Sequence, residues 1–270
     1  MIIDTFLFFN EIDMLKARLD YLGSSVDKFI IVESTIDFSS KKRDLLLTEV
    51  LLKTLPYNEK VTVVVWDPSV LYKNYVFPIA NKLGIRKILL QIQLMQRDCI
   101  GSVLGEYNEN DLILFSDLDE IPNLDSFKSA IPKALGSEYG IGVFEQDMYY
   151  YNTRTLVCRQ WRGTAICNVA TFRKLGGKCI RKNINKYIFV GDGWHFSYFA
   201  SPADIKKKID AIATVENLDY AKKLDLDLIK MSLVKGSDLY GRKGVSFEIL
   251  SQPIVPSQIL QVLRKYFSHA

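Results

Sequence analysis

One stretch of the chain decides the fold: Leu112-Ile113-Leu114-Phe115-Ser116-Asp117-Leu118-Asp119-Glu120-Ile121-Pro122. Its first four residues are all apolar, which predicts a strand buried on both faces, as in a parallel sheet. Three carboxylates follow directly after this strand. In open α/β sheets, ligands bind beyond the carboxyl ends of the strands. The stretch therefore predicts both a sheet position and a functional site.

Similar apolar runs occur on either side of this stretch. Strands are predicted at 3–9, 27–32 and 61–66, and the sheet continues at 141–144. Helical patterns separate the first four strands, at 11–22, 41–55 and 81–104, and further helical patterns occupy 203–213, 218–234 and 259–267. Strands that alternate with helices are typical of a doubly wound sheet. We therefore expect an α/β fold with a Rossmann-like, mostly parallel sheet flanked by helices.

The composition is that of a globular protein. The chain has 270 residues, of which 48% are hydrophobic and 24% charged, values that exclude disorder and collagen-like repeats. No linker separates the two halves, so we expect a single domain. No apolar run is long enough for a transmembrane helix. The N-terminal residues lack the basic region of a secretory signal.

Cysteine and histidine are sparse. The cysteines are Cys99, Cys158, Cys167 and Cys179, none in a CxxC pair, and the histidines are His195 and His269. This set favours neither a structural zinc site nor a disulfide scaffold. Together with the absence of an N-x-S/T sequon, it indicates a reducing, cytoplasmic setting.

Charge is spread unevenly along the chain. Residues 148–191 contain no Asp or Glu but nine basic residues: Arg154, Arg159, Arg162, Arg173, Lys174, Lys178, Arg181, Lys182 and Lys186. One interpretation is a solvated basic face. The other is a surface for an anionic partner such as a diphosphate, a lipid headgroup or RNA.

The carboxylates after the central strand suggest a cation site. Asp117, Asp119 and Glu120 repel one another unless a positive charge compensates them, and Mg²⁺ and Mn²⁺ prefer oxygen ligands. A DxD motif alone is weak, and a second one occurs at Asp225 and Asp227. That second pair lies in a Lys-flanked helical pattern, so we interpret it as a solvated face.

The segment Gly191-Asp192-Gly193-Trp194-His195-Phe196 contains the only His outside the extreme C-terminus. His195 is either packed within the domain or a third ligand to the cation. Trp194 could stack on a sugar ring, and core packing is the alternative.

Several blocks together resemble glycosyltransferase family 17, which includes the enzyme that adds the bisecting N-acetylglucosamine to N-glycans (a β-1,4-mannosyl-glycoprotein 4-β-N-acetylglucosaminyltransferase). The blocks are Phe9 to Leu15, with Arg18, Leu22-Gly23 and Val26 to Ser34; Asp111 to Pro122; Gly193 to Ser197; and Gly236 to Arg242. The animal enzymes carry a membrane anchor, which this sequence lacks. Where many relatives have a His before a Glu, this chain has Thr214 before Val215-Glu216.

The resemblance implies a GT-A type fold, a nucleotide-sugar donor, most simply a UDP-sugar, a glycan or glycolipid acceptor, and inversion at the anomeric carbon. It divides the chain 1–270 into a nucleotide-sugar-binding half (1–122), an acceptor-side half (123–250) and a C-terminal helical tail (251–270). It also implies Mn²⁺ or Mg²⁺ bridging the donor diphosphate. An anchorless member fits a bacterial or viral cytoplasmic enzyme.

Site roles follow from this resemblance. The expected metal ligands are Asp117, Asp119 and His195. Candidates for the general base are Glu120, Asp147 and Asp192. Candidates for donor binding are Glu11, Arg18, Glu33, Arg97, Asp117 and Trp194. For Glu11, Arg18 and Glu33, a structural ion pair is the alternative.

Two other classes of function remain open. A sugar nucleotidyltransferase also uses carboxylates and a metal, but it usually has a Gly-rich phosphate loop near the first strand, where this chain has Phe8-Phe9-Asn10-Glu11. A non-catalytic module of the same fold could bind nucleotides or an anionic surface. No RNA-binding motif is present, so no nucleic-acid partner is expected. Arg264, Lys265 and Phe267 of the tail could contact a membrane surface, and packing on the domain is the alternative.

Overall fold

The structure, a computed structural model, describes residues 1–37, 41–68, 94–216 and 224–269. The strands are β1 (Ile2–Phe8), β2 (Lys28–Ser34), β3 (Val61–Trp66), β4 (Leu112–Asp117), β5 (Glu120–Pro122), β6 (Ile141–Tyr150), β7 (Thr155–Asn168), β8 (Ile188–Ser197) and β9 (Glu248–Ile249). The α-helices are α1 (Ile12–Leu22), α2 (Glu49–Leu52), α6 (Phe127–Leu135), α7 (Val169–Leu175), α8 (Gly177–Lys182), α9 (Pro202–Glu216), α11 (Leu226–Lys235) and α12 (Ser257–Tyr266). Short 3-10 helices are η1 (Asn58–Lys60), η2 (Cys99–Glu106), η3 (Leu124–Ser126) and η4 (Ile184–Lys186).

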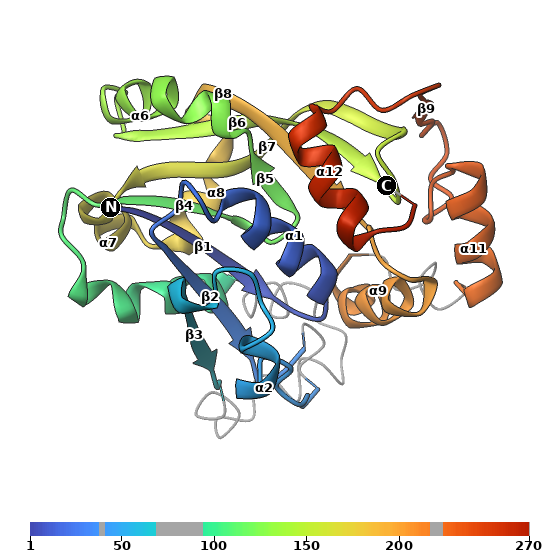
Figure 1. The fold of residues 1–270 in the computed structure, drawn as a ribbon, viewed down its shortest axis with the longest axis horizontal. Helices are drawn as coiled ribbons and strands as arrows, with labels where there is room; N and C mark the ends of the chain where they lie inside the picture. Colours follow the sequence, from blue (N-terminus) through green and yellow to red (C-terminus); the bar gives the residue numbers. More distant parts are fainter. Residues whose placement is uncertain (38–40, 69–93, 217–223, 270) are drawn as a thin grey trace.

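The described strands form one nine-stranded sheet in the order β3-β2-β1-β4-β7-β6-β8-β5, with β9 paired to β7 (Figure 1). Strands β3, β2, β1 and β4 are mutually parallel, and β6 is parallel to β8. Strand β7 lies antiparallel between β4 and β6, and β5 is antiparallel to β8. The predicted α/β architecture is confirmed, with the parallel pairing concentrated in the N-terminal half.

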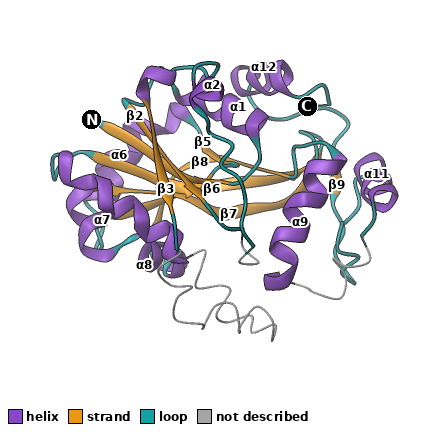
Figure 2. Cartoon of the chain, turned by 90° about the horizontal axis from the view of Figure 1, so that it is seen from below, coloured by secondary structure: helices purple, strands orange, loops and turns teal. Residues whose placement is uncertain are grey.

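Helices cover both faces of this sheet (Figure 2). One apolar core joins the sheet to α1, α6 and α12, and includes Leu15, Ala130 and Leu263. The opposite core joins it to η2, α7 and α8, and includes Leu104 and Phe172. Because the central strands are buried on both faces, β1 and β4 expose almost none of their side chains. A third cluster packs α9 and α11 beside the far ends of β6 and β8.

Two predicted helices differ from the structure. The pattern at 41–55 predicted one helix, but only Glu49–Leu52 is helical. The preceding residues instead bind a buried carboxylate, because the backbone N–H groups of Leu46 and Leu47 donate to Glu33. In the predicted helix 81–104, residues 81–93 lie outside the described residues. Residues 94–98 are helical and continue into η2.

The second half contains two long strands that the sequence pattern did not reveal. Strand β7 has a left-handed residue, Gln160 with φ 62°, and polar side chains along its middle, so no regular alternation marks it. Strand β8 contains Gly191 and Gly193. An added Cβ at Gly193 would lie 2.5 Å from the carbonyl oxygen of Ile121, so glycine allows β5 to approach β8.

The later helices lie where the sequence predicts them, except that residues 218–223 of the predicted helix 218–234 lie outside the described residues and α11 begins at Leu226. Asp225 caps α11 by accepting from the Leu228 N–H at 2.8 Å, and Asp227 pairs with Lys230 at 3.2 Å, as expected for a solvated DxD. The apolar side of α12 is buried against α1, and Lys265 pairs with Asp20 of α1 at 2.7 Å. The tail therefore packs on the domain. Within the described residues, no helix combines the length and apolarity needed to cross a membrane.

Candidate active site

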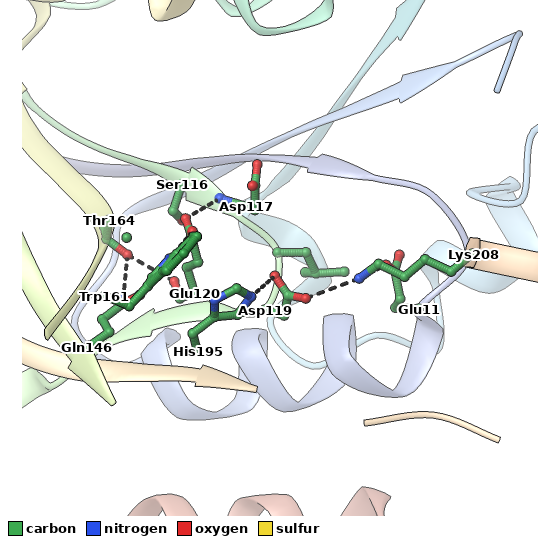
Figure 3. Close-up of polar contacts among 12 residues, drawn as sticks. Glu11, Ser116, Asp117, Asp119, Glu120, Gln146, Trp161, Thr164, His195 and Lys208 are labelled. Carbon is green, nitrogen blue, oxygen red and sulfur yellow. Dashed lines mark hydrogen bonds and ion pairs between the residues drawn. The ribbon is translucent and has the colours of Figure 1, made fainter. Parts of the chain in front are cut away.

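The carboxylate stretch forms a short connection between β4 and β5. Asp117 ends β4, and Glu120 begins β5. The antiparallel pairing of β5 with β8 places Glu120 opposite His195. The Asp-Leu-Asp-Glu segment and the Trp-His segment therefore meet at one place (Figure 3).

Arg18 holds this connection from beneath. It is completely buried, and its guanidinium makes a bidentate ion pair with Asp4 of β1, with both contacts at 2.7 Å. The remaining donors reach the Ser116 hydroxyl and the backbone carbonyls of Asp117, Leu118 and Glu120 at 2.7–3.1 Å. Because every donor nitrogen is used, Arg18 shapes the loop from inside the protein rather than contacting a donor molecule.

Glu120 is buried and fully hydrogen-bonded. One carboxylate oxygen accepts from Trp161 Nε1 at 2.8 Å and from Arg181 at 2.7 Å. The other accepts from Arg181 at 3.0 Å and from the Asp117 N–H at 2.9 Å. Its backbone carbonyl also accepts a hydrogen bond from the Thr164 hydroxyl, which in turn accepts one from Gln146 Nε2. Glu120 thus holds the loop in place. A general base needs a carboxylate oxygen that is free to accept a proton, and both oxygens of Glu120 already accept hydrogen bonds.

Asp117 faces two arginines. Arg97 Nη2 lies 2.6 Å from one oxygen, and Arg181 Nη2 lies 2.9 Å from the other. Burial acts to raise the pKa of Asp117, but the guanidinium groups outweigh it and lower the pKa to about 2. The Asp117 side chain is 34% exposed, so it borders solvent while remaining ionised.

Asp119 lies in a second, separate cluster. Its oxygens are 3.4 Å from His195 Nε2 and 3.1 Å from Lys208 Nζ, and Lys208 Nζ also lies 2.9 Å from Glu11 Oε1. Burial acts to raise the pKa of Asp119, but Lys208 and His195 hold it well below its usual range. Burial acts to lower the pKa values of His195 and Lys208, but nearby carboxylates outweigh it and raise both: Asp119 and Glu120 act on the pKa of His195, and Asp119 and Glu11 act on the pKa of Lys208.

Of the three predicted metal ligands, the structure brings Asp119 and His195 together, while Asp117 points to its arginines. Among the residues with described side chains, no three His, Cys, Asp or Glu residues form a ready metal site. Asp119 and Glu11 nevertheless enclose a positive charge, the ammonium of Lys208, while His195 contacts the other oxygen of Asp119. Carboxylate oxygens are also the ligands that Mg²⁺ and Mn²⁺ prefer. We therefore describe this pair of carboxylates as a cation site filled by lysine.

The remaining residues that the sequence predicted for donor binding lie in different parts of the fold. Glu33 is buried and accepts from Arg43 and two backbone N–H groups. Trp194 is in the core, edge-on to Tyr21 with ring centroids 6.0 Å apart, and offers no exposed platform. Both residues have structural roles here. Arg97 and Glu11, in contrast, lie at the carboxylate clusters.

Asp147 and Asp192 lie on the face of the sheet away from His195. In the β6–β8 register, Met148 pairs with His195, and Asp147 pairs with Trp194. Since successive strand residues point to opposite faces, Asp147 and His195 project oppositely. Asp192 shares the face of Trp194 and is bonded to Asn123 and Ser126. Burial raises the pKa of Asp147, partly opposed by Arg159. The structure does not bring either carboxylate to Asp119.

Three residues of the site were not singled out in the sequence: Lys208, Arg181 and Trp161. Lys208 lies between Ile205 and Ile209 on the buried side of α9. A lysine between apolar residues on one face of a helix needs a partner for its charge, so the sequence did contain a signal that could have identified Lys208. Arg181 belonged to the basic stretch, but nothing in that stretch distinguished it. Trp161 lies on β7, with its ring centroid 5.3 Å from that of His195.

Two cavities adjoin the site. The larger has about 430 Å³ and opens beyond the carboxyl ends of β1 and β2; Phe9, Asn10, Asp37, Lys41, Arg43, Asp44, Leu46, Lys207, Asp210 and Ala211 line it. Arg43 lies over the Phe9 ring at 4.7 Å. The smaller, of about 10 Å³, lies between Asn10, Glu11, Asp119 and Lys208. Asn10 borders both cavities, so the open cleft adjoins the cation cluster.

Comparisons with known proteins identify one family. The model of glycosyltransferase family 17 matches residues 1–248. No curated protein sequence matches the chain. Solved structures with a similar course include a 4-diphosphocytidyl-2C-methyl-D-erythritol synthase, at 12% identity and a TM-score of 0.44, covering 71% of this chain and 89% of that chain.

Two more solved structures are similar over larger shares of this chain. The 2-C-methyl-D-erythritol 4-phosphate cytidylyltransferase of Francisella tularensis has 10% identity and a TM-score of 0.40, covering 78% of this chain and 100% of its own. The galactosyltransferase LgtC, in complex with donor and acceptor sugar analogues, has 10% identity and a TM-score of 0.35, with 98% and 95% covered. All three likenesses are distant.

Proposed function

Because the chain belongs to glycosyltransferase family 17, we propose that this glycosyltransferase moves a sugar from a UDP-sugar to a hydroxyl of a glycan or glycolipid. N-acetylglucosamine is the first donor sugar to test, since the blocks at Phe9–Leu15 and Gly193–Ser197 resemble the family that includes the bisecting enzyme. We further propose that the transfer inverts the anomeric carbon. A retained anomer in the product would contradict that part.

The observation that carries the proposal is the position of Asp119. It follows β4, at the carboxyl edge of the parallel strands, where α/β proteins bind ligands. Arg18 and Glu120 fix the loop on which it lies. Its carboxylate is ionised and directed toward His195 and Lys208, beside the cavity that adjoins the cleft.

The cleft beyond β1 and β2 suits the nucleotide. Phe9 and Arg43 present an aromatic ring and a planar cation at its wall. Lys41 and Lys207 add positive charge, and the cleft is also lined by Asp37, Asp44 and Asp210. A base could stack on such planar groups, as bases do on aromatic and guanidinium planes. The donor diphosphate would then lie toward Asn10, where the cleft adjoins the cation cluster.

The chain's own residues organise the reacting groups. Asp119 and Glu11, which now share the Lys208 ammonium, would hold a divalent cation, which when bound neutralises charge on the leaving diphosphate. Arg97 and Arg181 keep Asp117 ionised at the border of the site. In the transfer, the acceptor oxygen forms a bond to the anomeric carbon, and the bond from that carbon to the diphosphate oxygen breaks. The nucleoside diphosphate leaves with the electron pair of that bond, and the proton of the acceptor hydroxyl passes to solvent water.

Thermal unfolding with UDP, GDP or dTDP, each with and without Mn²⁺, tests the donor site. A nucleotide at 100 times its dissociation constant stabilises the native state by about 2.7 kcal/mol. We expect UDP with Mn²⁺ to stabilise the wild type and Asp119→Asn to lose this effect. Asp227→Asn, the same change in the solvated DxD, is the matched control and should bind like the wild type.

Turnover is measured by release of UDP from UDP-N-acetylglucosamine in the presence of glycan acceptors. Stabilisation by GDP or dTDP instead of UDP would overturn the proposed donor but not the reaction class. Release of pyrophosphate from a nucleoside triphosphate and a sugar phosphate would instead identify a nucleotidyltransferase. Equal nucleotide binding by the wild type and Asp119→Asn would refute the role of Asp119.

A further inference from the structure

Lys208 is an unusual neighbour for a predicted metal ligand. Its side chain is only 19% exposed, and its ammonium lies between the carboxylates of Glu11 and Asp119 at 2.9 and 3.1 Å. The Tyr198 ring lies 5.7 Å from the same ammonium. Figure 3 shows Lys208 reaching Asp119 from the side opposite His195. The two carboxylates therefore enclose a cation that belongs to the protein itself, while His195 contacts the other oxygen of Asp119.

A polar atom beside the cavity that Lys208 lines has no partner. The small cavity beside Lys208 has about 10 Å³, close to the minimum that holds one water-sized species. Asn10 lines this cavity, and its Oδ1 is buried without a hydrogen-bond partner. This unpaired oxygen indicates a centre that lysine fills incompletely.

We propose that Lys208 is a displaceable counter-cation that competes with a divalent metal for Glu11 and Asp119. Two positive charges cannot share the space between these carboxylates without strong repulsion. Metal binding therefore requires the ammonium to withdraw, which the long flexible lysine stem allows. The inference rests on the proposed function only for its choice of metal, and it concerns the empty enzyme, before nucleotide or acceptor binds.

The competition has a regulatory consequence. In the free protein, the Lys208 ammonium neutralises the two carboxylates in the absence of metal, and it thereby lowers their affinity for metal. A donor diphosphate offers an alternative partner for both the metal and the released ammonium. The nucleotide should therefore raise the affinity for metal. Because coupling between two ligands is reciprocal, the metal should raise the affinity for the nucleotide by the same factor. Lys208 would thus make the enzyme bind metal together with its donor.

Metal binding without nucleotide tests this inference. We would titrate Mn²⁺ into the wild type, Lys208→Met and Lys206→Met, and follow free Mn²⁺ by electron paramagnetic resonance. Lys206 lies on the same helix and pairs with Asp210 on the surface, so it is the matched control. Lys208→Met should bind Mn²⁺ about tenfold or more tightly than the wild type, and Lys206→Met should not differ from the wild type.

A second measurement distinguishes a change in metal affinity from a loss of stability in the variants. Lys208→Met leaves Glu11 and Asp119 uncompensated, so its thermal midpoint in EDTA should fall and Mn²⁺ should restore it. Lys208→Gln, which keeps a hydrogen-bond donor, should behave in the same way. Equal Mn²⁺ affinity in the wild type and both variants would overturn the inference. Sugar transfer does not enter this readout, so an inactive protein whose Lys208 variants gain Mn²⁺ affinity would refute the proposed function alone.

Discussion

The guanidinium of Arg18 and the backbone carbonyl of Glu120 lie 2.7 Å apart, although 102 positions separate them in the chain. This contact connects the first helix to the loop that carries Asp117 and Asp119. Because the same guanidinium is anchored on Asp4 of β1, the loop is fixed to the central sheet. The position of the candidate active site thus depends on a buried ion pair beneath it.

Arg18→Met should destabilise the protein strongly. The change leaves Asp4 buried without its partner and removes the hydrogen bonds that Arg18 donates to three loop carbonyls. Breaking a buried ion pair costs about 3–5 kcal/mol. Urea unfolding at neutral pH measures the loss. Lys16→Met, on the same helix but partly exposed, should change the free energy of unfolding by about 0.5 kcal/mol or less. A loss below about 1 kcal/mol for Arg18→Met would contradict this role.

The variant Glu120→Gln tests whether Glu120 holds the loop in place or acts as the general base. The amide nitrogen cannot accept the hydrogen bonds that Arg181 and Trp161 donate, so we expect a loss of about 3 kcal/mol or more in unfolding free energy. Urea unfolding and UDP binding are measured on the same samples. A variant of wild-type stability and nucleotide affinity whose turnover alone falls would instead identify Glu120 as the base.

Asp238 gives the protein an acid-sensitive contact. Burial acts to raise its pKa, but hydrogen bonds from Arg242 lower it below the ordinary value of 3.8. A lowered native pKa stabilises the fold above the unfolded value, and this contribution is lost as the pH falls through the native pKa. Asp238→Asn should therefore be less stable than the wild type at pH 6, and the difference should shrink below about pH 4. Urea unfolding from pH 3 to 6 checks this, and a constant difference would argue against it.

Gly193→Ala should disturb the site through the backbone. The new Cβ would lie 2.5 Å from the Ile121 carbonyl oxygen and 2.9 Å from Pro122 Cα, and neither atom can rotate away. Overpacking of this kind costs about 1–3 kcal/mol. Gly105→Ala, where no atom lies within 4 Å of the added Cβ, is the control and should retain wild-type stability. Thermal unfolding compares the two variants, and equal midpoints would contradict the close approach of β5 and β8.

The sequence contained enough to predict the N-terminal half of the fold. Strands β1, β2 and β4 have apolar runs that are buried on both faces, so these parallel strands were recognisable, as was the more exposed edge strand β3. Their order placed Asp117 and Asp119 at the ligand-binding edge. The strands β7 and β8 were not recognisable. Glycines and polar residues interrupt their patterns, and their stability comes from pairing with distant strands.

By itself, then, the sequence determined the α/β class, the family and the place of the carboxylates. Only the tertiary structure decided which charges compensate them. Arg181 lies 64 positions from Asp117, and Lys208 lies 89 positions from Asp119. Ion pairs form between groups that folding brings within a few ångströms, whatever their separation in the chain. A local pattern can therefore show that a carboxylate needs a cation, but only the packed structure shows that lysine and arginine provide it here.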